Sequence, residues 1–149
     1  EALVLRIGNE AGDGPWQLAR LHVESDSAAA GSARVVLGHT DGRQVEVTAT
    51  GDGPVDAAFK AVENATGVDV KLRKFEVRSV SVGEDAQGEA VVTVEYRERS
   101  YRGTSVTTDI VESAVRAFLI VVNQIEATRH SVGRAGGEQR IAPTGAVAV

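Results

Sequence analysis

The sequence contains no cysteine and no methionine, and its 149 residues include only three prolines and one tryptophan. The lack of cysteine excludes disulfide bonds, thiolate metal sites and a cysteine nucleophile. No apolar run approaches the ~18–20 residues that a membrane-spanning helix needs, and no signal peptide is recognisable at the start. We therefore expect a cytoplasmic protein that does not bind membranes.

The charge balance is acidic, with 16 basic and 21 acidic residues and a net charge of −5. This balance disfavours nucleic acid as a partner. The length suits one compact domain with a sizeable core. Because the chain begins with glutamate and contains no methionine, we expect a fragment or a processed product.

Catalytic and metal-binding motifs are scarce. The three histidines, His22, His39 and His130, are scattered without the spacing of metal ligands, which favours surface histidines. No Gly-x-Ser-x-Gly nucleophile motif occurs. We therefore expect no catalytic residue and no metal site.

The sequence contains a repeat with an offset of 56 residues. The stretches "VDAAFKA" at 55–61 and "VESAVRA" at 111–117 share the order apolar, acidic, small, Ala, apolar, basic, Ala. At the same offset, residues 33–36 fall on residues 89–92. A constant offset through strand-like and helix-like segments indicates two related units.

The first unit has the pattern of three strands and a helix. The turn-forming stretch Thr40–Gly42 predicts a hairpin. After Pro54, apolar residues at i, i+3, i+4 and i+7 predict a helix that ends at Gly67. Alternating apolar and polar residues predict half-buried strands at 19–23, 33–37 and 45–49.

The second unit repeats this order. Its predicted strands are 71–82, 90–96 and 100–107, and a change of apolar parity between Val77 and Val80 indicates a bulge in the first of them, or burial of that strand on both faces. Asp109 and Glu112 have the spacing of a helix N-cap and its capping-box partner. The helix that follows is expected to end near residue 128.

The helix at 109–128 is apolar on nearly all sides. Such a helix is buried on more than one side. In a chain of this size we expect its spare face to meet a second subunit, with Phe118, Leu119 and Val122 at the interface.

The expected fold class is α+β, with two pseudo-symmetric β-β-β-α units whose antiparallel sheets carry the helices on one face. Residues 1–16 are predicted to be a linker or N-terminal extension. The domain covers 17–129, with units 17–67 and 71–129. The Gly- and Ala-rich residues 130–149 are predicted to be a flexible tail.

The stretch "TGDGP" at 50–54 leads into the first helix. Free N–H groups at a helix start attract an anion, and glycines let a ligand approach the backbone. With Asp52 beside them, the N–H groups suit a zwitterion, whose carboxylate they hold while Asp52 faces its ammonium. The alternative is a helix N-cap with a glycine turn and no ligand.

Three stretches carry a family resemblance: "TGDGPVDAAFKAV", "VSVGEDAQGEAVVTV" and "YRGTSVTTDIVESAVRAFLIVVNQI". Over about residues 17–127 the chain resembles the C-terminal regulatory domain of 2-isopropylmalate synthase. The resemblance implies a homodimeric domain that binds leucine as feedback inhibitor of the condensation of acetyl-CoA with 2-oxoisovalerate. The similar domain of citramalate synthase binds isoleucine instead.

The resemblance also implies what the chain lacks. In the family, catalysis belongs to a barrel domain that uses a divalent metal and acetyl-CoA. We therefore expect this chain alone to be no enzyme and to need no cofactor. Its effector is expected to be leucine; the alternatives are an isoleucine-sensing domain of citramalate synthase and a dimeric scaffold that binds no ligand.

The ligand-binding residues that the resemblance implies come from both units. The polar end of the ligand is expected at the turn before the first helix, one wall on the first strand of the second unit, and further contacts in the loop after it and at the start of the second helix. Many relatives have tyrosine where this chain has Phe75, so a contact through that hydroxyl is lost here. The expected leucine-binding residues are Gly51, Asp52, Gly53, Leu72, Phe75, Ser79, Ala86 and Ile110.

Overall fold

The predicted α+β fold with two β-β-β-α units is confirmed by the computed structural model, which describes residues 14–26, 29–80 and 87–141. Each unit is a three-stranded antiparallel sheet followed by a helix. Sheet A and its helix comprise β1 (Trp16–Asp26), β2 (Ala29–His39), β3 (Gln44–Gly51) and α2 (Pro54–Thr66). Sheet B and its helix comprise β4 (Lys71–Ser79), β5 (Gly88–Tyr96), β6 (Arg99–Thr107) and α3 (Ile110–Ile141).

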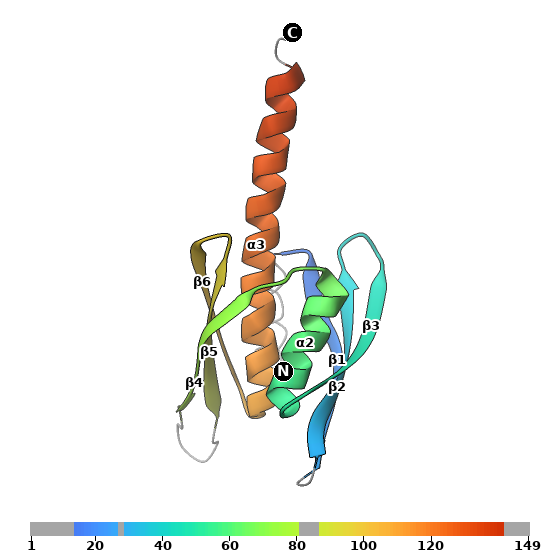
Figure 1. Cartoon of the computed structure of the whole chain (residues 1–149), viewed down its shortest axis with the longest axis vertical. Helices are drawn as coiled ribbons and strands as arrows, with labels where there is room; N and C mark the ends of the chain where they lie inside the picture. The colour runs from blue at the N-terminus through green and yellow to red at the C-terminus, as the bar shows by residue number, and fades with distance from the viewer. Residues whose placement is uncertain (1–13, 27–28, 81–86, 142–149) are drawn as a thin grey trace.

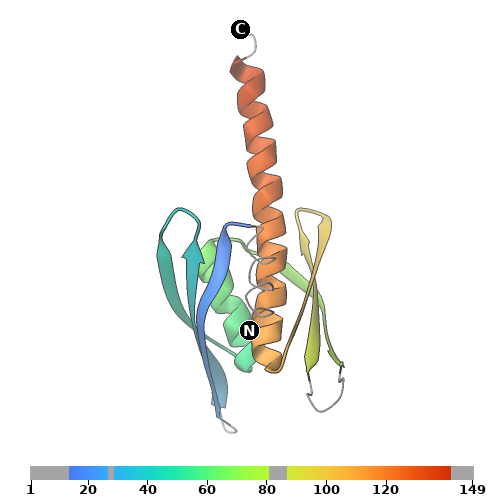
Figure 2. The same cartoon turned by 180° about the vertical axis from the view of Figure 1, so that it is seen from behind.

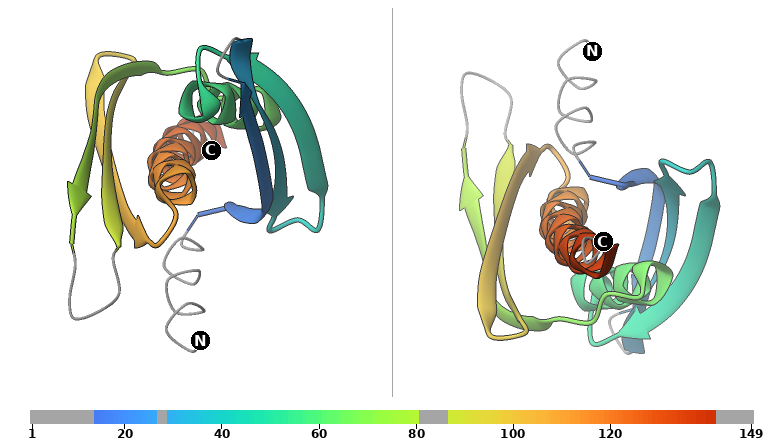
Figure 3. Two further views of the ribbon diagram at one scale, coloured as in Figure 1. Left: turned by 90° about the horizontal axis from the view of Figure 1, so that it is seen from below. Right: turned by 90° about the horizontal axis from the view of Figure 1, so that it is seen from above.

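The two sheets form the outer layers and the two helices lie between them (Figures 1 and 2). Helix α2 packs on β2 and β3, and α3 packs on β5 and β6. The views along the long axis show sheet A and sheet B facing each other across the helices (Figure 3). Both sheets therefore turn one face to the shared core and the other to solvent.

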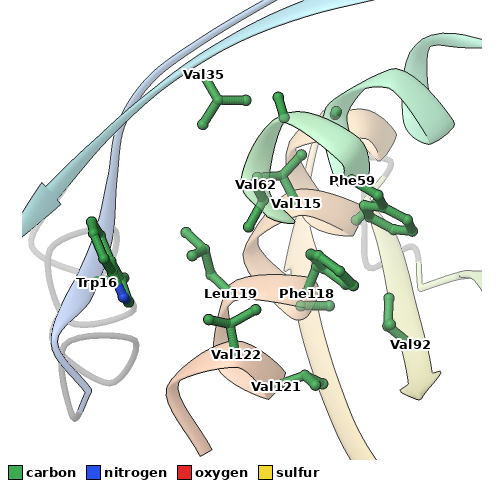
Figure 4. Close-up of a cluster of buried hydrophobic side chains, with 14 of the residues drawn as sticks. Trp16, Val35, Phe59, Val62, Val92, Val115, Phe118, Leu119, Val121 and Val122 are labelled. Carbon is green, nitrogen blue, oxygen red and sulfur yellow. The ribbon is translucent and has the colours of Figure 1, made fainter. Parts of the chain in front are cut away.

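The core explains why α3 is apolar all round. One side of α3 packs on sheet B, and its other sides contact α2 and β1 of the first unit. Phe118, Leu119 and Val122 are at most 1% exposed within the single chain, and Figure 4 shows them among side chains of both units. The second side of α3 is thus buried by the same chain. An interface role for these three residues stays a prediction, and it would require them to leave this core.

The helix boundaries of the first unit were predictable from local chemistry. Helix α2 starts with Pro54 at its first turn and ends at Gly67, whose φ of 76° is the left-handed conformation of a helix C-cap. The predicted hairpin at Thr40–Gly42 is also confirmed, with Gly42 at φ 97°.

The constant offset of 56 residues is wrong for the first two strands. It holds for the third strands, where Val47 corresponds to Gly103, and for the helices. In the second strands Val35 corresponds to Val92, an offset of 57, because these residues pair with Val47 and Gly103 respectively. The hairpin between Val92 and Gly103 is one residue shorter than the hairpin between Val35 and Val47. Its turn consists of Arg97 and Glu98, which both have positive φ.

The first strands differ further. The first of two register shifts in β1 lies between Leu18 and Arg20, and the shift in β4 lies between Leu72 and Lys74, so these strands correspond at an offset of 54. The bulge predicted between Val77 and Val80 is therefore misplaced. The apolar pattern failed there because β4 already ends at Ser79, before the second of those valines.

The predicted start of the first strand and the predicted end of the second helix are also wrong. Strand β1 begins at Trp16, which the sequence analysis assigns to a linker, and this side chain is buried. Helix α3 continues to Ile141 instead of ending near residue 128, and it projects beyond both sheets (Figure 1). Helical hydrogen bonds are local, so a helix can continue where the apolar pattern stops. The next helix-breaking residue in the sequence is Pro143.

The remaining termini are outside the described residues. These are residues 1–13 of the predicted linker and residues 142–149 of the predicted tail. The division into linker, domain and tail stays a prediction. Within the described ranges, no helix combines the length and the apolar character needed to cross a membrane.

Candidate functional site

Both helices begin at the same end of the molecule, the lower end in Figure 1. The last residue of β3, Gly51, leads into α2 at this end. The last residue of β4, Ser79, pairs there with Gly88, the first residue of β5. The topology thus gathers two helix N-termini and the ends of both sheets in one region.

The turn before α2 is shaped by Gly51, which is buried. A Cβ at this position would collide with the Asp56 carboxylate and with the backbone N–H of Ala57. Gly53 is the N-cap of α2 in an extended conformation, and no side chain of the described residues makes a cap hydrogen bond there. The side chain of Asp52 is exposed beside it. The glycine turn therefore keeps the start of α2 open.

Asp56 is a residue of this region that the sequence analysis missed. Its Oδ2 accepts a hydrogen bond of 3.0 Å from the backbone N–H of Asp52 and lies 3.5 Å from Lys60 Nζ. One N–H group that was predicted to face a ligand is therefore held by the chain itself. An acidic residue in the first turn of a helix is the sequence pattern that indicates such a contact.

The start of α3 is closed, in contrast to that of α2. The predicted N-cap is confirmed: Asp109 Oδ1 accepts hydrogen bonds from the N–H groups of Val111, at 2.8 Å, and Glu112, at 3.1 Å. The predicted capping-box partner is wrong. Thr107 Oγ1 accepts the N–H of Asp109 at 3.1 Å, while Glu112 binds Arg116 at 2.8 Å. Of the two helix starts, only that of α2 is free of a side-chain cap within the described residues.

A buried hydroxyl fixes the first turn of α3 to sheet B. Ser113 is fully buried, and its Oγ donates to the carbonyl of Gly88 at 3.1 Å. The same oxygen accepts the N–H of Thr107 at 2.9 Å. Ser113 therefore joins α3 to both neighbouring strands. A small polar residue in an apolar helix pattern is the feature that could have indicated it.

The predicted wall residues lie on the inner side of sheet B. Phe75 pairs with Val92 and packs edge-on against Phe59 of α2, with ring centroids 5.9 Å apart. Ile110 lies over the start of β5, where a Cβ on Gly88 would collide with its Cδ1. Ser79, which pairs with Gly88, is thereby close to Ile110.

Leu72 and Ala86 do not join this group in the described structure. Seven residues of extended strand span roughly 23 Å, so Leu72 and Ser79 lie at opposite ends of β4. One amino acid does not reach both within a single chain. Ala86 lies outside the described residues. Binding roles for Leu72 and Ala86 stay predictions.

The inner face of β4 is less covered than that of β1. Leu72 is 45% exposed and Val77 is 46% exposed. Their counterparts in β1, Leu18 and Val23, pack against the core, because α2 and α3 both contact β1. The two units therefore differ at this strand, and β4 presents an apolar surface.

The outer face of sheet A has a shallow, open depression of about 240 Å³. Its lining residues are mostly polar, and His22 Nε2 lies 3.1 Å from Glu24 Oε2 in it. The second histidine, His39, packs edge-on against Trp16 at the start of β1. Among the described residues, no three His, Cys, Asp or Glu side chains are grouped as metal ligands would be.

Comparison with known proteins places these features in a family. Residues 1–126 match the family described as the LeuA allosteric (dimerisation) domain. The 2-isopropylmalate synthase of Rhodopirellula baltica is 42% identical over 126 residues, which cover 85% of this chain and 24% of that protein.

Two further relatives carry the same name. The 2-isopropylmalate synthase of Stenotrophomonas maltophilia is 41% identical over 120 residues, covering 78% of this chain and 22% of that protein. That of Shewanella pealeana is 33% identical over 123 residues, covering 83% and 24%. The chain thus spans about a quarter of the length of these relatives. The resemblance noted in the sequence is confirmed, and the chain belongs to the LeuA allosteric (dimerisation) domain family.

Proposed function

We propose that this chain is the regulatory domain of a 2-isopropylmalate synthase and binds leucine as a feedback inhibitor. The observation that carries the proposal is the family match over residues 1–126, together with relatives that are all named 2-isopropylmalate synthase. The inhibited reaction is the condensation of acetyl-CoA with 2-oxoisovalerate. Catalysis, with its divalent metal, belongs to another part of the whole protein, and this domain needs no cofactor.

The start of α2 is proposed to hold the polar end of leucine. Its uncapped N–H groups lie at the positive end of the helix dipole, which favours a carboxylate by about 0.3–1 kcal/mol at an exposed site. The exposed carboxylate of Asp52 is beside them and faces the ammonium group. Asp56 opposes a bound carboxylate, but Lys60 lies near it and offsets part of this charge.

The apolar end of leucine is proposed to lie toward Ile110 and Phe75. Both residues are only partly buried, and they come from the elements that meet α2 at this end of the fold. Burying a leucine side chain contributes about 1.5–3 kcal/mol. Valine, one methylene smaller, is therefore expected to bind more weakly by about ten- to two-hundredfold.

Calorimetric titration of the chain tests this proposal. Leucine should bind, and 4-methylpentanoate, which lacks the ammonium, should bind poorly. Asp52→Asn should weaken leucine binding, whereas the control Asp69→Asn, at the other end of α2, should not. Tighter binding of isoleucine than of leucine would support the citramalate synthase alternative. Absence of binding by all branched-chain amino acids would support a scaffold without a ligand.

We also propose that the chain forms a homodimer in which a second copy covers the inner face of β4. The family description names dimerisation, and Leu72 and Val77 lack the cover that their counterparts in β1 have. Val77→Asp should shift sedimentation equilibrium toward the monomer. The control Thr104→Asp, on an exposed position of β6, should leave the association unchanged. A parent chain that is monomeric at micromolar concentration would contradict the proposal.

A further inference from the structure

The start of β1 is fastened to the middle of α3 by two hydrogen bonds between Trp16 and Asn123. The backbone N–H of Trp16 donates to Asn123 Oδ1 at 3.0 Å, and Asn123 Nδ2 donates to the carbonyl of Trp16 at 2.9 Å. We call this pair of bonds the clasp. It joins residues that are 107 positions apart in the sequence.

The clasp is built into the core. Asn123 is only 6% exposed and lies among the buried Val121, Val122 and Ile125 of α3. Its amide offers a donor and an acceptor side by side, as a neighbouring strand would, so it pairs with both backbone groups of one residue. Aspartate lacks the donor and an aliphatic residue lacks both. A Cβ on Gly14 would collide with the Asn123 side chain, so glycine there permits the close approach.

The ring of Trp16 also has contacts of its own. His39 packs edge-on against it with centroids 4.5 Å apart, and the Arg43 guanidinium lies 5.6 Å from the ring centroid. The indole Nε1–H points to Glu126 Oε2 at 3.5 Å. The start of β1 is therefore fixed to α3 and to the hairpin between β2 and β3.

Helix α3 connects the clasp with the proposed ligand end. Ile110 and Asn123 are separated by roughly 20 Å of continuous helix. We infer that the clasp is a strap that passes a displacement of α3 to the start of β1, at Trp16. Leucine as the cause of that displacement rests on the proposed function; the mechanical link itself does not.

Trp16 is the only tryptophan, so its indole N–H signal and its fluorescence each report on this one position. Two kinds of perturbation are expected to move α3. One is saturating leucine. The other is Gly103→Ala, whose Cβ would collide with the backbone carbonyl of Ala117 in α3, or Gly88→Ala, whose Cβ would press on Ile110. Thr104→Ala is the control, because Thr104 adjoins Gly103 but its side chain is exposed.

In ¹⁵N-labelled full chain, each perturbation should shift the indole and backbone amide signals of Trp16, whereas Thr104→Ala should not. Asn123→Ala should raise amide exchange at Trp16 by about tenfold and abolish the response while leucine still binds. The control Gln124→Ala, at the exposed neighbouring position, should retain it.

The inference is overturned if the folded Gly103→Ala or Gly88→Ala chain leaves the Trp16 signals as Thr104→Ala does. It is also overturned if the response survives in Asn123→Ala. If leucine fails to bind while the glycine variants shift Trp16, the proposed function fails and the strap stands. If leucine binds and neither it nor the glycine variants affect Trp16, the strap fails and the proposed function stands.

Discussion

Phe59 of α2 stacks on Phe118 of α3, with ring centroids 4.5 Å apart and ring planes at 17°. The stack joins the helix of the first unit to the helix of the second, since each sheet packs mainly on its own helix. Phe75 of β4 adds an edge-on contact to the same ring of Phe59. The two units therefore share one aromatic cluster and form a single core.

Phe118→Ala should lower the free energy of unfolding by about 3–5 kcal/mol, because it removes a buried ring and leaves a cavity between the units. Urea denaturation followed by circular dichroism measures this loss. Ile120→Ala, at a half-buried position of the same helix, is the control and should cost less. An equal loss in both variants would mean that the stack does not hold the units together.

Substitutions in the tight turn between β5 and β6 should raise the stability of the fold. Arg97 and Glu98 have φ values of 53° and 67°, which favour asparagine and glycine in a two-residue hairpin. The double change Arg97→Asn with Glu98→Gly should raise the free energy of unfolding by roughly 1 kcal/mol. Glu98→Ala keeps the unfavourable conformation and should give no gain. A double variant no more stable than Glu98→Ala would count against strain in this turn.

The N-cap of α3 should contribute more than the ion pair beside it. Asp109→Ala removes the acceptor of two backbone N–H groups and should cost about 1 kcal/mol of stability. Glu112→Gln affects only its contact with Arg116 and should cost about 0.5 kcal/mol or less. Thermal unfolding of both variants measures the two losses of stability. A larger loss in Glu112→Gln than in Asp109→Ala would favour the capping-box interpretation.

Burial raises the pKa of Glu63, although the hydrogen bond from the Val70 N–H opposes this shift. A pKa that is higher in the folded than in the unfolded chain gives stability at low pH that is lost as pH rises through the folded value. Glu63→Gln keeps an acceptor for Val70 without the charge. It should match the parent near about pH 3.5 and be more stable at about pH 7. Denaturation at both values tests this, and a less stable variant at neutral pH would contradict it.

The elements of the fold were predictable where their limits depend on local chemistry. Pro54, Gly67 and Asp109 define helix ends through backbone geometry and hydrogen bonds within a few residues, and all three were identified from the sequence. The offset between the units was not constant because the hairpins differ in length, which a comparison of short motifs does not detect. The extension of α3 was missed because helical bonds need no apolar pattern.

The contacts between distant segments were not predictable from patterns. Trp16 was assigned to a linker because the alternation that defines β1 begins after it, while its burial depends on Asn123. The apolar spare face of α3 correctly indicated a second buried side, but periodicity does not tell whether that side meets the same chain. For the site, the resemblance supplied the residues, and the structure adds Asp56 and the contrast between the two helix starts.

Leucine is proposed to bind at the end of the fold where α2 and α3 begin. Titrating ¹⁵N-labelled chain with leucine, and following every backbone amide, tests this most directly. We predict saturable shifts that are largest at Gly51, Gly53, Ser79 and Ile110. The proposed site is contradicted if leucine causes no saturable shift, or if the shifts are confined to the outer face of sheet A around His22 and Arg34.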